Sequence, residues 1–324
     1  MRFSVVGSAL ALASLVKLAF TGATYSLSDE IIGAGFYDKF NFEAIPDPTH
    51  GRVNYVDRQT AQDLKLTVAT SDSFILRADD TTVLSPTGPG RNSVRIRSNA
   101  AYTTHVAVFK ISHMPEGCGT WPAVWETLEA DWPKNGEIDI LEGVNNMAPN
   151  QAHLHTSPNC SIPTDVDDYQ LGTVKTTNCD ATVNYNSGCG SSFSNGPASF
   201  GPDFNEEGGG WFAVERTNQY ISVWYWASWD VFGTPIDIRW GSPMVDTSLW
   251  GMPSAYFPNT ECDIASHFGP NNIIINLTFC GDWAGNPDIY KQSSCPATCV
   301  DFVNNNPEAF SGAFFKFDSI RIYE

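Results

Sequence analysis

The chain has little positive charge. Of its 324 residues, 18 are Lys or Arg and 36 are Asp or Glu, so its formal net charge is −18. A surface of this sign repels polyanions, which argues against a nucleic-acid ligand and favours a neutral partner. We therefore expect neither nucleic acid nor a charged polymer to be the natural ligand.

Long apolar runs are missing after the first two dozen residues, so we expect no segment that spans a membrane. The N-terminus itself has the pattern of a secretory signal: Arg2, then an apolar stretch interrupted by Lys17, then small residues at 21–23. We predict a cleaved signal at residues 1–22 and a secreted mature protein. Because we find neither internal repeats nor a linker, we expect one domain over residues 23–324.

The eight cysteines show no C-x-x-C spacing, which disfavours a zinc site. An even number of cysteines after a secretory signal predicts disulfides, although eight cysteines allow 105 pairings and the sequence does not select one. Cys295 and Cys299 are close enough along the chain to form a local bridge.

Helical periodicity is also missing, and strand signals dominate instead. Apolar and polar residues alternate over residues 64–68, and β-branched or aromatic runs cover 220–226, 273–279 and 317–323. We predict an all-β antiparallel sandwich or jelly roll, with residues 159–205 forming long loops tied by disulfides.

Three acids stand within six residues of one predicted strand. Glu137 and Asp139 share a face because strand side chains alternate, and Ile138 then faces the core. Simple alternation would bury Glu142 with the isoleucines, at high energetic cost. A β-bulge near residues 140–141 would return Glu142 to the acidic face, so we predict one there.

Three carboxyl groups on one face predict glycosidase chemistry. Their mutual repulsion raises at least one pKa, which keeps one group protonated as an acid while another attacks as a nucleophile. A solvated acidic face or part of a calcium site is the alternative, although calcium prefers flexible loops to a strand rich in isoleucine.

The motif Glu137-Ile-Asp-Ile-Leu-Glu142 resembles the signature of glycoside hydrolase family 16, in the longer form with a bulge that is typical of laminarinase-like members. Five more segments are similar to that family: residues 119–125, 154–155, 274–277, 281–285 and 317–323. The resemblance implies a concanavalin A-like β-jelly-roll of two curved sheets with an open cleft. It also implies that the anomeric configuration is retained, with Glu137 as the nucleophile, Glu142 as the general acid/base and Asp139 as a hydrogen-bonding partner that tunes Glu137.

Aromatic rings stack on the apolar faces of sugars, and short polar side chains bind their hydroxyls. From the resemblance and the nearby sequence we expect substrate contacts from six residues: Trp121, Trp125, Trp132, His155, Asn276 and Trp283. Trp224 and Trp226 share a strand face and are either a further stacking stripe or core residues. We expect Trp211, Trp240 and Trp250 to pack in the core or in loops.

Metal and cofactor signals are weak. His153 and His155 share a face but have no third ligand at an evident spacing, and we interpret His153 as structural. Some members of the family hold calcium through an acid in the last strand, where Asp318 stands. We otherwise expect no metal, no cofactor and a monomer.

The sequence favours an endo-acting hydrolase of β-1,3-glucan, with branched or mixed β-1,3/1,4 chains as further substrates. Two alternatives stay open. A cell-wall transglycosylase would use the same two steps with a sugar hydroxyl in place of water. A catalytically inactive glucan-binding lectin would use the same cleft, but it would not need three acids.

Overall fold

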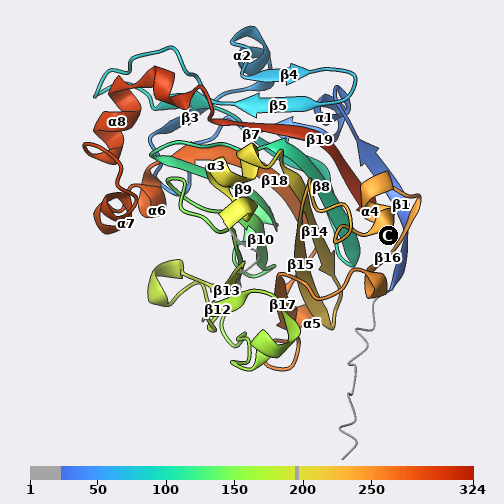
Figure 1. The fold of residues 1–324 in the computed structure, drawn as a ribbon. Helices are drawn as coiled ribbons and strands as arrows, with labels where there is room; N and C mark the ends of the chain where they lie inside the picture. Colours follow the sequence, from blue (N-terminus) through green and yellow to red (C-terminus); the bar gives the residue numbers. More distant parts are fainter. Residues whose placement is uncertain (1–22, 194–196) are drawn as a thin grey trace, which may run out of the picture.

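A computed structural model describes residues 23–193 and 197–324, so the predicted signal at 1–22 lies outside the described residues. In this part of the chain two large antiparallel sheets face each other as a β-jelly-roll (Figure 1). The predicted fold class is therefore confirmed.

The first sheet has nine strands in the described residues. Seven of them follow one another across the sheet: β16 (Met244–Asp246), β1 (Thr24–Ile31), β19 (Phe314–Tyr323), β8 (His105–His113), β14 (Gly210–Arg216), β15 (Tyr220–Ala227) and β17 (Ala255–Pro258). The other two, β5 (Phe74–Arg77) and β4 (Thr67–Ala69), continue from β19.

The second sheet contains the acidic strand, β10, near its middle. Its order is β12 (Thr173–Thr176), β13 (Cys189–Ser192), β11 (Gln151–His155), β10 (Glu137–Glu142), β9 (Thr120–Thr127), β18 (Asn271–Phe279), β7 (Arg95–Tyr102) and β2 (Phe40–Phe42). A separate parallel pair joins β3 (Val53–Tyr55) to β6 (Arg91–Ser93).

The helices are short. The α-helices are α1 (Gly35–Lys39), α2 (Arg58–Asp63), α3 (Gly201–Glu206), α4 (Ile236–Trp240), α5 (Ile264–His267), α6 (Gly281–Ala284), α7 (Pro287–Gln292) and α8 (Cys299–Asn305). Single 3₁₀ turns occur at η1 (Glu129–Asp131), η2 (Val166–Tyr169), η3 (Asn184–Asn186), η4 (Pro197–Ser199), η5 (Thr247–Leu249) and η6 (Pro307–Phe310). A bilayer crossing needs a helix far longer than any of the α-helices found in the described residues. Figure 1 shows α6, α7 and α8 on the side of the molecule opposite α4 and β16.

The main core fills the space between the sheets. Phe109 and Phe212 from the nine-stranded sheet, and Ile138 and Ile275 from the eight-stranded sheet, belong to one fully buried cluster. Alternation then places the other face of β10 on the outside of this core, where the acids lie.

Two predictions about local structure were wrong. Residues 64–68 do not form one strand, because Asp57 caps α2 and the chain enters β4 only at Thr67. Residues 159–205 are more than loops, since they contribute β12 and β13 to the second sheet. The local bridge that the spacing of Cys295 and Cys299 would allow does not form, because each pairs with another cysteine.

All eight cysteines form disulfides, as predicted. The pairs are Cys118–Cys295, Cys160–Cys262, Cys179–Cys189 and Cys280–Cys299. Two of these bridges attach the segment after β18 to the eight-stranded sheet, because Cys118 lies just before β9 and Cys280 lies just after β18. The other two hold the segment between β11 and β13.

The core makes a stability prediction. Phe109 has no exposed surface, and truncating it leaves a cavity between the sheets. We expect Phe109→Ala to lower the free energy of unfolding by about 3–5 kcal/mol. Val68→Ala, at a position that is 39% exposed, is the matched control and should cost less than about 1 kcal/mol. Urea unfolding followed by circular dichroism measures both, and equal losses in the two variants would contradict this description of the core.

Candidate active site

Strand β10 contains the predicted bulge. Asp139 pairs with Trp125 on β9, but the next pair joins Leu141 to Val124, so Ile140 is the extra residue. The register toward β11 shifts over the same interval. Because of this insertion, Glu142 points to the same face as Asp139, while Ile140 and Leu141 are fully buried in the core.

The bulge is held by Asn150, a residue that the sequence did not single out. Its side-chain Nδ2 donates to the Ile140 carbonyl over 3.0 Å, and its Oδ1 accepts from the Glu142 backbone N–H over 2.9 Å. Asn150 is itself fully buried. One side chain therefore satisfies two backbone groups that the bulge removes from the ladder.

The three acids lie together, with Asp139 in the middle. One carboxylate oxygen of Asp139 lies within 4.8 Å of Glu137, and one lies within 4.8 Å of Glu142. Each glutamate also receives a hydrogen bond from an indole: Trp132 Nε1 donates to Glu137 Oε2, and Trp121 Nε1 donates to Glu142 Oε1 over 2.9 Å. The sequence predicted this gathering of carboxylates on one face.

Two histidines of β11 stand beside the acids. His155 Nε2 is 3.2 Å from Asp139 Oδ2, and its other ring nitrogen, Nδ1, is 2.8 Å from Asn186 Oδ1. His153 Nδ1 is 3.8 Å from Glu142 Oε2. His153, which we interpreted as structural, therefore lies beside Glu142.

Burial and mutual repulsion set the charge of this cluster. Burial raises the pKa of Glu142 to about 7, with the charge of Glu137 acting in the same direction. Burial, then Glu137 and Glu142, raise the pKa of Asp139 well above its ordinary value. Burial alone would lower the pKa of His155, but its close contact with Asp139 and the charges of the three acids raise it to about 10. Burial lowers the pKa of His153 to about 3, so this ring is neutral.

Further side chains that we predicted to bind the substrate lie near the acids and contact one another. Trp125 Nε1 donates to Asn276 Oδ1 over 2.7 Å, and the Arg95 guanidinium lies 5.0 Å from the Trp125 ring. Trp283 stands on α6 and contacts Trp121 edge-on, with ring centroids 5.6 Å apart. The structure thus connects the predicted aromatic residues to the acids or to one another, and it adds Arg95.

Two predictions about aromatic residues have different outcomes. Trp224 and Trp226 are not a stacking stripe on an open face, because they are only 4% and 8% exposed and both pack edge-on against Trp250. Trp211 and Trp250 belong to the same packed cluster, as expected, whereas Trp240 is 74% exposed on α4.

Asp318 does not have the surroundings of a calcium ligand. Its Oδ2 is 3.2 Å from Lys110 Nζ, and its Oδ1 accepts a hydrogen bond from Ser112 Oγ. Both oxygens are therefore engaged, one of them with a cation. In the described residues, groups of three metal-ligating side chains occur only within the acid and histidine cluster of β10 and β11. These groups are Glu137, Asp139 and His155, and Asp139, Glu142 and His153.

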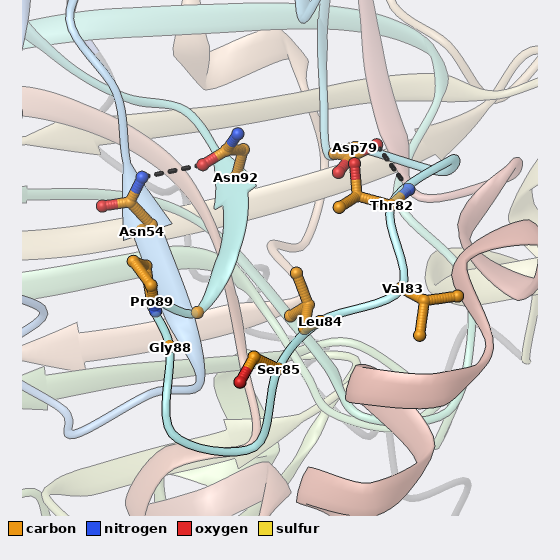
Figure 2. A pocket seen from close by; sticks show the side chains of 10 residues that line it. Asn54, Asp79, Thr82, Val83, Leu84, Ser85, Gly88, Pro89 and Asn92 are labelled. Atoms are coloured by element: carbon orange, nitrogen blue, oxygen red, sulfur yellow. Dashed lines mark hydrogen bonds between the residues drawn. The ribbon is translucent and has the colours of Figure 1, made fainter.

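A separate hollow of about 300 Å³ lies between the β3–β6 pair and the loop before β6. Figure 2 shows Asn54 bonded to Asn92 on one side and Val83, Leu84 and Ser85 on the other. Its lining includes neither the clustered acids nor an aromatic ring. This hollow is therefore separate from the acid cluster of β10.

Comparison with known proteins agrees with this geometry. Residues 40–323 match the family model described as XgeA-like, catalytic GH16 domain. The solved structure of GH16 laminarinase 16A from Phanerochaete chrysosporium, which holds two β-glucans in its donor and acceptor sites, is 55% identical and superposes with a TM-score of 0.91 over 93% of this chain and 100% of that chain.

Two further relatives differ in activity. An elongating GH family 16 β-1,3-glucosyltransferase is 38% identical, with a TM-score of 0.84 over 93% of this chain and 100% of that chain. An endo-1,3(4)-β-glucanase of Arthroderma benhamiae is 40% identical over 97% of this chain and 68% of its own length. The family model, the fold and the bulged acidic strand agree, and the chain belongs to glycoside hydrolase family 16.

Proposed function

We propose that the chain is a retaining, endo-acting hydrolase of β-1,3-glucan in which Glu137 is the nucleophile and Glu142 is the general acid/base. One observation carries the assignment of roles: burial raises the pKa of Glu142 to about 7, on the same strand face as Glu137. A carboxyl group with this pKa still holds a proton near neutral pH and can give it to a leaving oxygen.

The reaction then has two steps. In the first, Glu137 attacks the anomeric carbon, the bond to the leaving oxygen breaks, and Glu142 gives that oxygen its proton. In the second, Glu142, now a carboxylate, removes a proton from water, which attacks the same carbon and releases Glu137. Asp139 lies between the two glutamates, with a carboxylate oxygen within 4.8 Å of each, so its charge state influences theirs.

Six side chains would bind the glucan. Trp132 and Trp121 already donate to the catalytic glutamates, so a sugar between them meets both an aromatic face and an acid. We assign contacts with the sugar rings and hydroxyls to the full predicted set: Trp121, Trp125, Trp132, His155, Asn276 and Trp283. Relatives described as laminarinase and endo-1,3(4)-β-glucanase support a β-1,3-linked chain as the substrate.

A substrate panel tests the proposed activity. The mature protein would be incubated with soluble β-1,3-glucan, mixed β-1,3/1,4-glucan and β-1,4-glucan, and the products separated by length over time. We expect early release of oligosaccharides of several lengths from the first two polymers. Release of glucose alone would contradict endo action, and cleavage of only the β-1,4 polymer would contradict the linkage.

The pH dependence follows from Glu142. The acid must carry its proton, so activity is present below its pKa and is lost as pH rises through it. We expect kcat/KM to fall about tenfold per pH unit above pH 7, because the raised pKa of Glu142 is about 7 in the free enzyme. Initial rates on soluble β-1,3-glucan from pH 4 to 9 measure this limb. A profile that stays flat up to pH 9 would contradict the role of Glu142.

Transfer to a sugar hydroxyl is the second candidate activity, because a relative that is 38% identical over 93% of the chain is a glucosyltransferase. Both activities share the first step and differ only in the acceptor. Products longer than the starting oligosaccharide, present early and at low substrate concentration, would favour transfer over hydrolysis.

We further propose that the protein is secreted and acts as a monomer, without cofactor, on a polysaccharide outside the cell. Four disulfides support an oxidising compartment. Its negative charge supports a neutral substrate rather than nucleic acid or an anionic membrane.

A further inference from the structure

A short loop closed by a disulfide lies beside the two histidines of β11. Cys179 and Cys189 form its ends, and Cys189 begins β13. In the ladder between β11 and β13, Leu154 pairs with Cys189 and His153 pairs with Gly190. The end of the loop is therefore fixed against the strand that carries both histidines.

Two glycines of this segment contact the imidazole rings. A Cβ atom at Gly188 would lie 2.8 Å from His155 Cε1 and 2.9 Å from its Nε2. At Gly190, a Cβ atom would lie 2.1 Å from His153 Cδ2. Real Cβ atoms do not approach so closely, so the bare backbone packs directly on both rings and restricts their rotation.

The same loop provides a hydrogen-bond acceptor. Asn186 Oδ1 is 2.8 Å from His155 Nδ1, and a carbonyl oxygen only accepts, so Nδ1 carries the hydrogen. The backbone at this position is left-handed, with φ of 51°, 56° and 58° at Asn184, Tyr185 and Asn186. Such a run is unfavourable for residues other than glycine, at about 1 kcal/mol or more each, and it persists where the surrounding structure holds it. The run lies inside the loop that the Cys179–Cys189 disulfide closes.

We propose that Asn186 is a positioning residue, which fixes His155 with Nδ1–H toward Asn186 and Nε2 toward Asp139, and so holds the Asp139 carboxyl between Glu137 and Glu142. This inference rests on the proposed function only for its effect on catalysis. The titratable groups that face His155 are the three acids of β10 and, on its own strand, His153.

Removal of the acceptor should weaken the charged form of His155. His155 is only 7% exposed, so water cannot fully replace the lost partner of Nδ1–H. Because hydrogen bonding to the charged form favours it, loss of Asn186 should lower the pKa of His155 from its raised value of about 10. A neutral His155 with its hydrogen on Nδ1 has none on Nε2, so the contact that orients Asp139 is lost.

Glycine is the appropriate substitution, because it adopts a φ of 58° without strain and so removes the side chain while sparing the backbone. Asn186→Gly would be compared with Asn184→Gly, a matched control in the same left-handed run. Asn186→Asp restores an acceptor and serves as the rescue variant. Circular dichroism and the thermal midpoint report whether each variant is folded.

The readout is the ¹⁵N NMR titration of His155 in protein labelled at histidine, together with kcat and KM on soluble β-1,3-glucan. For Asn186→Gly we expect the His155 titration to move down by at least about one pH unit, and kcat to fall about tenfold, with a smaller change in KM. Asn186→Asp should return both toward wild type, and Asn184→Gly should change neither.

A wild-type titration of His155 in Asn186→Gly would overturn the proposal, as would an equal loss of kcat in Asn184→Gly. The NMR measurement needs no substrate. If the wild-type protein failed to cleave β-1,3-glucan, the proposed function would fall, while the titration would still show whether Asn186 fixes His155.

Discussion

Glu137→Ser is expected to lower the release of reducing ends from soluble β-1,3-glucan by at least about 10⁴-fold, because no other group can form the covalent intermediate. Asp139 cannot replace Glu137, since it is only 2% exposed and its pKa is raised well above the ordinary value. Binding of the polymer should persist, because the proposed sugar-binding residues, including Trp121, Trp125 and Trp283, are unchanged. Affinity electrophoresis in gels containing glucan measures binding separately from turnover.

The control for this experiment is Glu206→Ser, the same substitution at an exposed position on α3, which should retain full activity. Near wild-type turnover by Glu137→Ser would remove Glu137 from the nucleophile role. A wild-type protein that binds glucan without cleaving it would instead support the lectin alternative.

Glu142→Gln is expected to have an effect that depends on the leaving group. With glucan, where the leaving sugar oxygen needs a proton, kcat should fall about 10²–10⁴-fold. With an aryl β-glucoside oligomer, whose phenolate leaves without protonation, the first step should stay close to wild type and the intermediate should accumulate as a burst. The fall of kcat/KM above pH 7 should also disappear in this variant, because the group whose pKa is raised to about 7 is gone.

Burst kinetics with both substrates, measured beside Glu137→Gln, separate the two roles. The Glu137 variant should lose both steps with both substrates. If Glu142→Gln lowered the rate of the first step equally with both substrates, Glu142 would not act as the acid.

The acidic face of β10 could be predicted because two simple constraints conflict there. Alternation would bury Glu142, and a lone buried carboxylate is costly, so one extra residue was required. The structure places that residue at Ile140. The support from Asn150 could not be predicted, because its side chain reaches the bulge from the turn before β11, and no local pattern reports such a contact.

Alternation does not show which side of a strand is covered. Trp224 and Trp226 share a face of β15, as the sequence indicated, but Trp250 from a later segment covers that face. The same applies to Asn186, which meets His155 through a loop that the sequence presented only as rich in small and polar residues. Disulfide partners also depend on tertiary contact, as the Cys118–Cys295 pair shows across 177 residues.

The most direct test of the central claim is to trap the covalent intermediate. The mature protein would be incubated with a laminari-oligosaccharide that carries a 2-fluoro substituent at its reacting sugar and an activated leaving group, and then analysed by intact mass and peptide mapping. Our account predicts one added glycosyl unit per chain, on the peptide that contains Glu137 and attached to that residue. A label on Glu142 or Asp139, or turnover to a product of inverted configuration without any label, would contradict it.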